Sequence, residues 1–258
     1  MSSSLRLATH RVAIVTGAAR GIGKSVALRL AQDGHDVAVV DMRGSAVYEV
    51  EREIKALGRR SMALYTDVSK DQEVEKMVND VAGKLGGVDI MVANAGICRA
   101  GTVLDTRTED FRNIMDVNAS GVFFCYKHAG LRMVKQGRGG RIIGASSGAG
   151  KIGGKHWFAY SASKFAVRGM TQAAALELAQ YNITVNAYAP GVIETKMSQE
   201  LFESLQDQSI RSHILAATPV GRFGDPDDIA NYVSWLTSED SAFVTGQTVS
   251  ISGGAYFD

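Results

Sequence analysis

Short apolar segments recur along the chain, and longer segments with helical periodicity separate most of them. The strand-like segments are rich in valine, isoleucine and alanine, and they do not alternate with polar residues as half-exposed strands do. They cover residues 11–16, 37–41, 62–67, 90–94, 141–146, 183–189 and 247–252. Buried strands that alternate with helices predict a parallel sheet covered by helices on both faces, which is an α/β fold.

The pattern predicts one domain over residues 1–258, because no internal repeat, low-complexity tract or linker interrupts it. We expect a doubly wound sheet of about seven strands, whose ligands bind at the carboxyl ends of the strands where the strand order reverses. The stretch 197–221 departs from the alternation because it is mostly polar. We predict that it forms short helices that act as a lid over the substrate.

A glycine-rich turn follows the first predicted strand and precedes the helical segment 24–34. Gly17 allows a tight turn, Gly21 lets the backbone approach a pyrophosphate, and Gly23 permits close packing of helix on strand. The free amides at the start of the helix would bind the phosphates. This order of strand, glycine turn and helix predicts a dinucleotide-binding site.

The second predicted strand ends in Asp41, which follows Gly23 by 18 residues. A carboxylate at this place accepts hydrogen bonds from the adenosine ribose hydroxyls and repels a 2′-phosphate, so the sequence favours NAD(H) over NADP(H). Arg20 and Arg43 leave an alternative open. They would either provide a cationic site for the phosphate or remain solvated surface charges.

Tyr160 and Lys164 lie four residues apart in the run YSASK, so they share one face of a predicted helix. A phenol has an ordinary pKa of about 10, and a nearby ammonium lowers that pKa by stabilising the phenolate. The pair is therefore a candidate proton donor and acceptor. Taken alone, the same spacing also fits an exposed helix with a solvated lysine.

Together, the Gly-x-x-x-Gly-x-Gly spacing and the Tyr-x-x-x-Lys pattern resemble the classical branch of the short-chain dehydrogenase/reductase family, which has a Rossmann-type fold. The resemblance extends through Asp67-Val68, Asn94-Ala95-Gly96, Asn118 and the loop 190–195. It implies that the following residues bind the cofactor: Gly17, Arg20, Gly21, Ile22, Gly23, Asp41, Asp67, Val68, Asn94, Ala95, Gly96, Tyr160, Lys164, Pro190, Gly191, Val192 and Thr195.

The resemblance also implies a catalytic set of Asn118, Ser147, Tyr160 and Lys164. Tyr160 would give a proton to the substrate oxygen or take one from it, while Ser147 would hold that oxygen. Lys164 would lower the pKa of Tyr160 and bind the nicotinamide ribose, and Asn118 would position a water. Ser146 is the alternative serine, but the offset of 13 residues from Tyr160 favours Ser147.

Two positions depart from the family pattern. Ala93 stands where many members have asparagine, and Gly144 stands where many have asparagine before the serine pair. Neither position supplies a reacting group, so we expect an active enzyme. A dinucleotide-binding sensor without catalysis is the alternative from another functional class.

Segments 163–179 and 246–258 are similar to the acetoin and diacetyl reductase (2,3-butanediol dehydrogenase) group. That similarity implies a small vicinal hydroxyketone or diol as the substrate, namely diacetyl, acetoin or 2,3-butanediol. A sugar alcohol or ketose is the second choice, and 3-oxoacyl or steroid substrates come third. The residues predicted to contact the substrate are Ser147, Gly148, Gly154, His156, Trp157 and Tyr160. The glycines among them predict an open pocket, and Trp157 is the candidate for an apolar wall that caps it.

Composition narrows the possible partners. Because 28 Lys and Arg residues balance 27 Asp and Glu residues, the formal net charge is +1, and charge gives no reason to expect nucleic acid or an anionic membrane as a partner. Cys98 and Cys125 are too few for a disulfide framework and lack the spacing of metal ligands, so we predict free thiols and no metal.

The chain shows no secretory signal and no membrane-spanning stretch, which predicts a cytoplasmic location. The family resemblance implies a homotetramer or homodimer built through the helices that carry Asn118 and Tyr160 and through the C-terminal segment. The apolar run 122–130 fits either such an interface or ordinary packing on the sheet.

Overall fold

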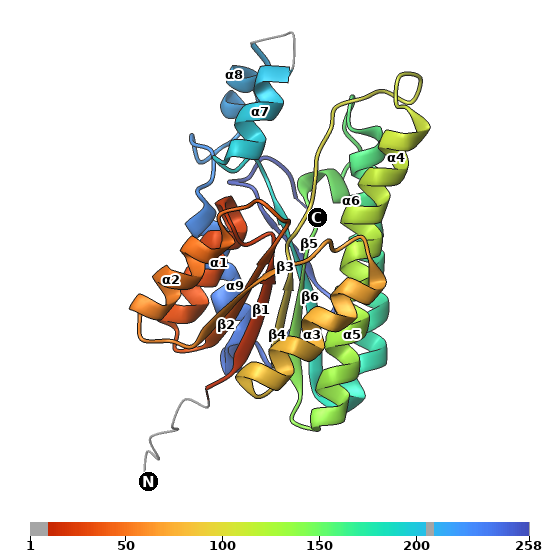
Figure 1. Ribbon diagram of the computed structural model, residues 1–258. Helices are drawn as coiled ribbons and strands as arrows, with labels where there is room; N and C mark the ends of the chain where they lie inside the picture. Colours follow the sequence, from red (N-terminus) through yellow and green to blue (C-terminus); the bar gives the residue numbers. More distant parts are fainter. Residues whose placement is uncertain (1–9, 205–208, 258) are drawn as a thin grey trace.

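A seven-stranded parallel sheet runs through the middle of the molecule (Figure 1). The computed structural model describes residues 10–204 and 209–257. The strand order is β3-β2-β1-β4-β5-β6-β7. The strands are β1 (Val12–Thr16), β2 (Asp36–Asp41), β3 (Ser61–Tyr65), β4 (Ile90–Ala93), β5 (Gly140–Ala145), β6 (Ile183–Pro190) and β7 (Thr248–Ile251). The predicted doubly wound α/β fold is confirmed, and each of these strands overlaps one of the predicted strand-like segments.

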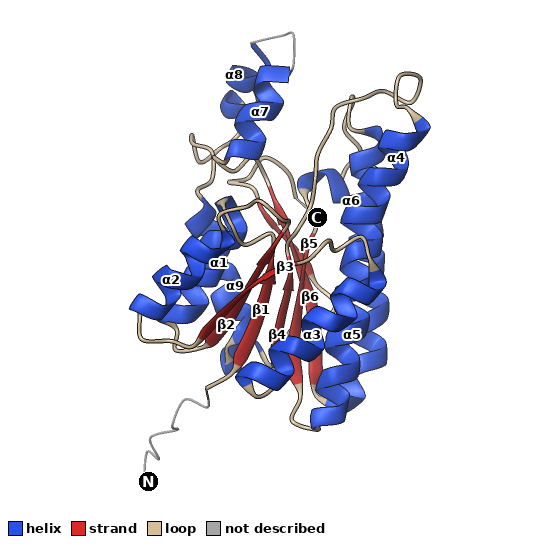
Figure 2. Ribbon diagram, viewed as in Figure 1, coloured by secondary structure: helices blue, strands red, loops and turns tan. Residues whose placement is uncertain are grey.

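Helices cover both faces of the sheet (Figure 2). Helices α1, α2 and α9 pack on one face, and α3, α5 and α6 pack on the other. The helices are α1 (Gly21–Gln32), α2 (Val47–Ala56), α3 (Asp71–Leu85), α4 (Thr108–Met115), α5 (Gly121–Gln136), α6 (Phe158–Leu178), α7 (Lys196–Ser204), α8 (Ser209–Ala216) and α9 (Pro226–Thr237). Shorter helical turns are η1 (Asp116–Ser120), η2 (Gly148–Gly150), η3 (Ala179–Tyr181) and η4 (Glu239–Ser241).

Apolar and polar residues do not alternate along the strands, because both faces of the sheet are buried. All five residues of β1 are buried, with alternate side chains entering the two apolar layers. Thr16 at the end of β1 pairs in register with Val40 of β2, and the amide of Ala18 donates to the carbonyl of Val40 at 3.0 Å. The glycine turn after β1 therefore lies beside Asp41, which ends β2.

Helices α4 and α5 form one rod, because the π-helical turn η1 joins them without a break. A π turn contains an extra residue relative to an α turn and is frequent at functional sites. Asn118, one of the predicted catalytic residues, lies in this turn.

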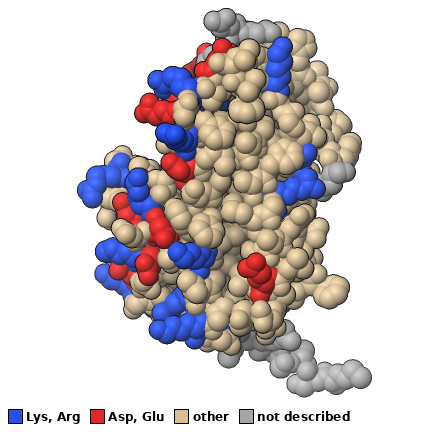
Figure 3. Space-filling model, turned by 90° about the vertical axis from the view of Figure 1, so that its right-hand side faces the viewer, with Lys and Arg blue, Asp and Glu red and all other residues tan. Residues whose placement is uncertain are grey.

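The outer face of α5 and α6 carries apolar side chains. Phe123 and Leu131 on α5 and Phe165 and Leu176 on α6 are exposed, while Cys125 and its neighbours on the inner side of α5 pack on the sheet. Figure 3 shows a broad and largely uncharged area in the middle of this side of the molecule. The run 122–130 therefore serves core packing and also leaves Phe123 on the surface.

Within the described part of the chain, no helix combines the length and the apolar character needed to cross a bilayer. Both cysteines are free, as predicted; Cys98 is half-buried and Cys125 is buried.

Candidate active site

Tyr160 and Lys164 lie on the first two turns of α6, which begins at the carboxyl end of the sheet (Figure 1). The Nζ atom of Lys164 is 5.6 Å from the centre of the Tyr160 ring and donates a hydrogen bond to the carbonyl oxygen of Ala145 at 2.8 Å. Lys164 is only 3% exposed. Burial lowers the pKa of its ammonium group to about 8, because a charged group loses its hydration there.

The two serines after β5 have different partners. Ser147 forms a side-chain hydrogen bond with Tyr160, and its Oγ also accepts a hydrogen bond from the Ala149 amide at 3.2 Å. Ser146 points elsewhere and donates to the backbone carbonyl of Lys164 at 3.0 Å. The structure thus places Ser147 beside the phenol, whereas Ser146 ties the start of its loop to α6.

The environment of Tyr160 corrects one expectation. Burial raises the pKa of its phenol, the hydrogen bond from Ser147 opposes this rise, and the ammonium of Lys164 is directed at Ala145. The lowering of the Tyr160 pKa that the sequence suggested is therefore not found in this structure. Tyr160 is a protonated hydrogen-bond donor at neutral pH.

Asn118 is fully buried and uses its whole amide group in hydrogen bonds. Its Nδ2 donates to the carbonyl of Ile97 at 2.9 Å and to Ser163 at 3.1 Å, and its Oδ1 accepts from the Ile97 amide at 2.8 Å. A Cβ atom at Gly96 would lie 3.2 Å from Asn118 Oδ1 and 3.4 Å from Lys164 Nζ. The loop after β4, the π turn and α6 therefore meet at Gly96. The water assigned to Asn118 stays a prediction.

The glycine turn has the shape that a pyrophosphate requires. Gly17 and Gly21 have φ of +65° and +54°, in the left-handed region that favours glycine. A Cβ atom at Gly23 would come closer than 3.0 Å to the Gly17 carbonyl, so only glycine lets α1 pack on this turn. Ile22 lies between Gly21 and Gly23 in the first turn of α1. Arg20, at the N-cap position, forms no side-chain capping bond within the described structure, so the turn fits an anionic group at the α1 amides.

Asp41 is held in place by the glycine turn. Its two carboxylate oxygens accept hydrogen bonds from the amides of Ala19 at 2.9 Å and Met42 at 2.7 Å. Arg43 lies over the ring of Tyr65, 5.6 Å from its centre. The carboxylate is therefore fixed at the end of β2, and the arginine next to it already has a partner.

Asn94 acts as a brace for the glycine turn. Its Nδ2 donates to the carbonyls of Thr16 and Gly17 at 2.8 and 3.2 Å, and its Oδ1 accepts from the Tyr188 hydroxyl at 2.8 Å. Thr16 Oγ1 in turn accepts from the amides of Asn94 and Ala95. Sequence reasoning missed Thr16 and Tyr188, because both lie inside segments that read as apolar strands.

The other predicted cofactor residues also lie at the carboxyl ends of the strands. Asp67 accepts two hydrogen bonds from Ser69, and Val68 is buried against Gly121. In the loop after β6, the Gly191 amide donates to Ile251 at 2.9 Å, and the carbonyl of Val192 accepts from Gly224 at 3.0 Å.

Thr195 connects this loop to the glycine turn. A Cβ atom at Gly21 would lie 3.3 Å from Thr195 Cγ2. Helix α7 begins at the next residue, and its Glu200 lies 3.9 Å from Arg20 and 3.6 Å from Lys196. The described part of the predicted lid therefore stands over the glycine turn (Figure 1), while its residues 205–208 lie outside the described residues.

The substrate side of Tyr160 is narrower than the glycines suggested. The Trp157 ring lies 6.1 Å from the Tyr160 ring, and a Cβ atom at Gly154 would lie 2.7 Å from Trp157 Cδ1. A Cβ atom at Gly148 would come closer than 3.0 Å to the Tyr256 ring. The open space predicted at the two glycines is not found, because an aromatic side chain fills it at each, whereas Trp157 lies beside Tyr160 as the apolar wall that the sequence suggested.

His156 stands apart from these contacts. Its side chain is exposed and its φ is +67°, which is uncommon for a residue other than glycine. Its carbonyl accepts a hydrogen bond from the Gly101 amide at 2.8 Å. The structure therefore shows a backbone role for His156 in joining two loops.

Cys98 adds a thiol to the same region, close enough to Tyr160 and Lys164 to interact with both electrostatically. Burial raises the pKa of this thiol to about 12, so it is protonated and a poor nucleophile.

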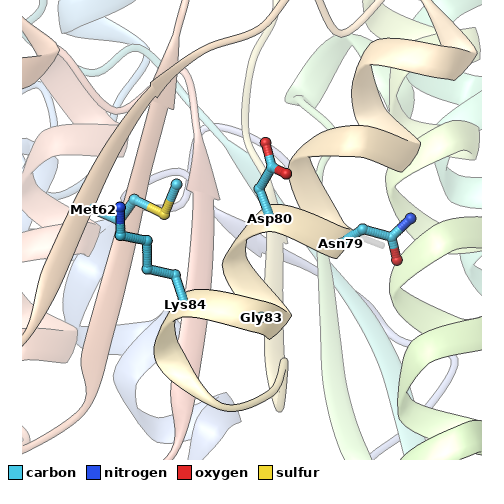
Figure 4. A pocket seen from close by; sticks show the side chains of 5 residues that line it. All are labelled: Met62, Asn79, Asp80, Gly83 and Lys84. Carbon is cyan, nitrogen blue, oxygen red and sulfur yellow. The ribbon is translucent and has the colours of Figure 1, made fainter.

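A separate surface hollow lies between β3 and α3 (Figure 4). It contains none of the predicted site residues, and its lining consists of Met62, Asn79, Asp80, Gly83 and Lys84.

Comparisons with known proteins bear on this arrangement. The family model described as enoyl-(acyl carrier protein) reductase matches residues 17–256. A short-chain dehydrogenase/reductase of Armillaria gallica is 46% identical over 99% of this chain and 100% of that protein. The 3-oxoacyl-[acyl-carrier-protein] reductase of Staphylococcus epidermidis is 41% identical over 96% of this chain and 99% of that protein. The crystal structure of acetoin dehydrogenase from Enterobacter cloacae is similar, with a TM-score of 0.86 and 37% identity over 96% of each chain.

Proposed function

Since this chain belongs to the short-chain dehydrogenase/reductase family of oxidoreductases, we propose that it is an NAD(H)-dependent enzyme that interconverts a ketone and a secondary alcohol. The observation that carries this proposal is the contact of Ser147 with Tyr160, with Lys164 one helical turn away. A sensor without catalysis would not need a half-buried phenol and hydroxyl beside a buried ammonium.

The reduction needs a hydride at the carbonyl carbon and a proton at the carbonyl oxygen. The bound nicotinamide supplies the hydride and becomes oxidised. Ser147 and Tyr160 donate hydrogen bonds to the substrate oxygen, and Tyr160 transfers its proton to that oxygen as negative charge develops there. A proton from solvent then restores the phenol, and Lys164, held at the carbonyl of Ala145, would bind the nicotinamide ribose. In the direction of alcohol oxidation, the phenolate of Tyr160 removes the proton from the alcohol.

The protein fits a nicotinamide dinucleotide at the carboxyl edge of its sheet. The glycine turn and the first amides of α1 would hold the pyrophosphate, and Asp41 would accept hydrogen bonds from the adenosine ribose. Two observations support NAD(H) over NADP(H). Asp41 is fixed by two amides, and both Arg20 and Arg43 have partners, namely Glu200 and Tyr65.

We propose a small vicinal hydroxyketone or diol as the substrate, such as diacetyl, acetoin or 2,3-butanediol. Trp157 and Tyr256 narrow the space around Tyr160 and favour a small molecule. The similarity to an acetoin dehydrogenase at 37% identity agrees with this choice. A polyol or ketose is the alternative within the same chemistry.

A 3-oxoacyl thioester is a second candidate, because a 3-oxoacyl-[acyl-carrier-protein] reductase is 41% identical to this chain. An acidic carrier protein would need free cations near the entrance. Arg99 and Arg107, which lie near the loop after β4, are both paired with Asp110. We therefore place this candidate after the small diols.

The deciding experiment measures NADH and NADPH oxidation with diacetyl, acetoin, a ketohexose and an acetoacetyl thioester. We expect the highest kcat/KM with diacetyl or acetoin and with NADH. Highest activity on the ketohexose or on the thioester would replace the substrate assignment, and NADH binding without turnover of any carbonyl would favour the sensor.

We further propose that a second copy of this chain covers the outer face of α5 and α6. This face is largely uncharged and carries the exposed Phe123, Leu131, Phe165 and Leu176 (Figure 3). Large apolar patches of this kind mark interaction sites. Trp235, Phe243 and Phe257 are exposed near the C-terminal side and would serve a second contact in a homotetramer.

Helices α7 and α8 would act as a lid over the substrate. The cytoplasmic location of the protein stays a prediction.

A further inference from the structure

The C-terminal tail returns to the active site. After β7, Gly253 and Gly254 have φ of +61° and +87°, which turns the chain back toward the sheet. The carbonyl oxygen of Tyr256 accepts a hydrogen bond from Ser252 Oγ at 3.2 Å. This turn brings Tyr256 between the loop that follows β5 and the loop that follows β6.

The hydroxyl of Tyr256 connects these two loops. It donates a hydrogen bond to the carbonyl of Pro190, and it forms a backbone hydrogen bond with Gly148. Burial raises the pKa of this phenol, so it remains a donor at physiological pH. The loop of Ser147 and the loop predicted to contact the nicotinamide are therefore joined by one side chain.

The ring of Tyr256 occupies the space over Gly148. A Cβ atom at Gly148 would come closer than 3.0 Å to three atoms of this side chain, so any residue but glycine would displace the ring. Gly148 directly follows Ser147, whose hydroxyl is bonded to Tyr160, and Tyr256 is close enough to raise the pKa of Tyr160. Tyr256 thus lies beside the atoms that would hold the substrate oxygen.

The geometry points to Tyr256 as a specificity-determining residue that limits the size of the substrate group on the Gly148 side of the reacting carbonyl. The inference rests on the proposed ketone reductase activity and deepens it. Trp157 bounds Tyr160 from another side. A substrate whose group next to the carbonyl is a methyl would fit, whereas a ring at that place would collide with Tyr256.

The test compares two symmetric diketones that differ only in the size of their end groups, diacetyl and benzil (diphenylethanedione), with NADH. We expect the wild type to prefer diacetyl. Tyr256→Ala and Tyr256→Leu remove the ring and should raise the ratio of kcat/KM for benzil over diacetyl by roughly tenfold or more. Tyr256→Phe keeps the ring and should keep the wild-type ratio. Tyr181→Ala is the control for loss of an aromatic side chain, because Tyr181 is 43% exposed and lies in η3, at the opposite end of β6 from the site.

A coupled variant tests the contact itself. Gly148→Ala alone should lower activity, since its methyl group has no room under the ring, and Tyr256→Ala should restore much of that loss in the double variant. Melting temperatures identify any variant that fails to fold, and Tyr256→Leu retains more of the buried apolar contact than Tyr256→Ala.

The outcomes separate the two proposals. If the wild type turns over neither diketone nor any other ketone, the proposed function fails and this inference fails with it. If the wild type reduces diacetyl while folded Tyr256→Ala and Tyr256→Leu keep the wild-type ratio, only the role of Tyr256 is overturned. A purely structural role would lower kcat/KM for both diketones equally and leave the ratio unchanged. Equal use of both diketones by the wild type would also contradict the size limit.

Discussion

Lys164 points its ammonium at the carbonyl oxygen of Ala145, 2.8 Å away, while that ammonium also lies 5.6 Å from the centre of the Tyr160 ring. The lysine is therefore anchored to the end of β5 and held at a fixed distance from the phenol. Ser147, two residues after Ala145, reaches the same phenol. The end of β5 thus positions both Ser147 and Lys164 beside Tyr160.

Replacing Tyr160 by Phe should remove the group that exchanges the proton with the substrate. We expect turnover to fall by roughly two to four orders of magnitude, the usual contribution of a positioned general acid, while NADH binding stays within a few fold. Steady-state assays of ketone reduction measure turnover, and fluorescence titration measures the binding of NADH. Wild-type turnover in Tyr160→Phe would contradict the assignment, and Tyr126→Phe, at a buried tyrosine bonded to Thr171, controls for the loss of a buried hydroxyl.

The buried ammonium of Lys164 should make stability depend on pH in the alkaline range. Its pKa is lowered by burial to about 8, whereas the unfolded chain has the ordinary value of about 10.4. The folded state therefore loses this proton first, so the stability that Lys164 contributes is present above the unfolded pKa and is lost as pH falls through 8.

Chemical unfolding of the wild type and Lys164→Met between pH 7 and 10 would reveal this dependence. The wild type should gain on the variant above pH 8, by on the order of 1 kcal/mol per pH unit. Below pH 8 the difference should be flat. A difference that falls with rising pH would show that the lysine is instead stabilised in its charged form.

Removing the charge of Asp41 should weaken the preference for NADH. Asp41→Asn keeps the size of the side chain and one acceptor for the backbone amides, but it no longer repels a 2′-phosphate. We expect the ratio of kcat/KM for NADPH over NADH to rise by roughly tenfold or more, since a like-charge contact costs several kcal/mol. Adding Arg43→Met tests whether that arginine leaves Tyr65 to bind the phosphate. An unchanged ratio in Asp41→Asn would place cofactor selection elsewhere.

Alanine should lower the affinity for NADH at Gly23, whereas it should raise the stability of the protein at Gly83. Gly23→Ala would push a methyl group against the Gly17 carbonyl and Asn94, so NADH affinity should fall by roughly tenfold or more as the turn opens. Gly83→Ala places its methyl group in open space on α3, in the hollow of Figure 4. It should raise the free energy of unfolding by roughly 0.5–1 kcal/mol through helix propensity alone. Thermal melts and NADH titrations of the pair would check both, and a loss of activity in Gly83→Ala would assign that hollow a function.

A charge on the outer face of α6 should break the proposed assembly. Phe165→Glu puts a carboxylate among the exposed apolar residues of α5 and α6, where it would be desolvated by the second copy. We expect the mass measured by light scattering to fall from a tetramer to a smaller species. Leu104→Glu serves as the control, because Leu104 is 92% exposed and lies outside this face. A monomeric wild type would contradict the proposal directly.

Sequence reasoning found the fold because buried parallel strands lack alternation, and it placed the glycine turn because strand, glycines and helix occur in order. Ser147 was chosen over Ser146 by its offset from Tyr160, and the structure places it beside the phenol. Trp157 was expected as an apolar wall, but the position of Tyr256 over Gly148 could not be predicted. That contact depends on a C-terminal tail that folds back onto a loop far away in the sequence.

Sequence reasoning also missed polar side chains within strands that hydrogen-bond to neighbouring segments. Thr16 and Tyr188 lie in segments whose other residues are apolar, so their hydroxyl groups read as incidental. Their partner Asn94 was predicted as a cofactor residue on resemblance, whereas its side chain binds Thr16, Gly17 and Tyr188. Such contacts between different strands appear only when the strand order and register are known.

The π turn between α4 and α5 fixes the rotation of one helix relative to the other, so this rod tolerates no insertion or deletion. Residues before Asp116 and after Ser120 belong to helices whose angular phases differ by the one residue that the turn inserts. Deleting that residue would restore a regular helix and rotate everything on one side of it by about 100°. Either Asn118 would leave Ile97, or Val122 and Cys125 would leave the sheet. Insertions and deletions acquired during divergence should therefore collect in the flanking loop 97–107 rather than in the rod itself.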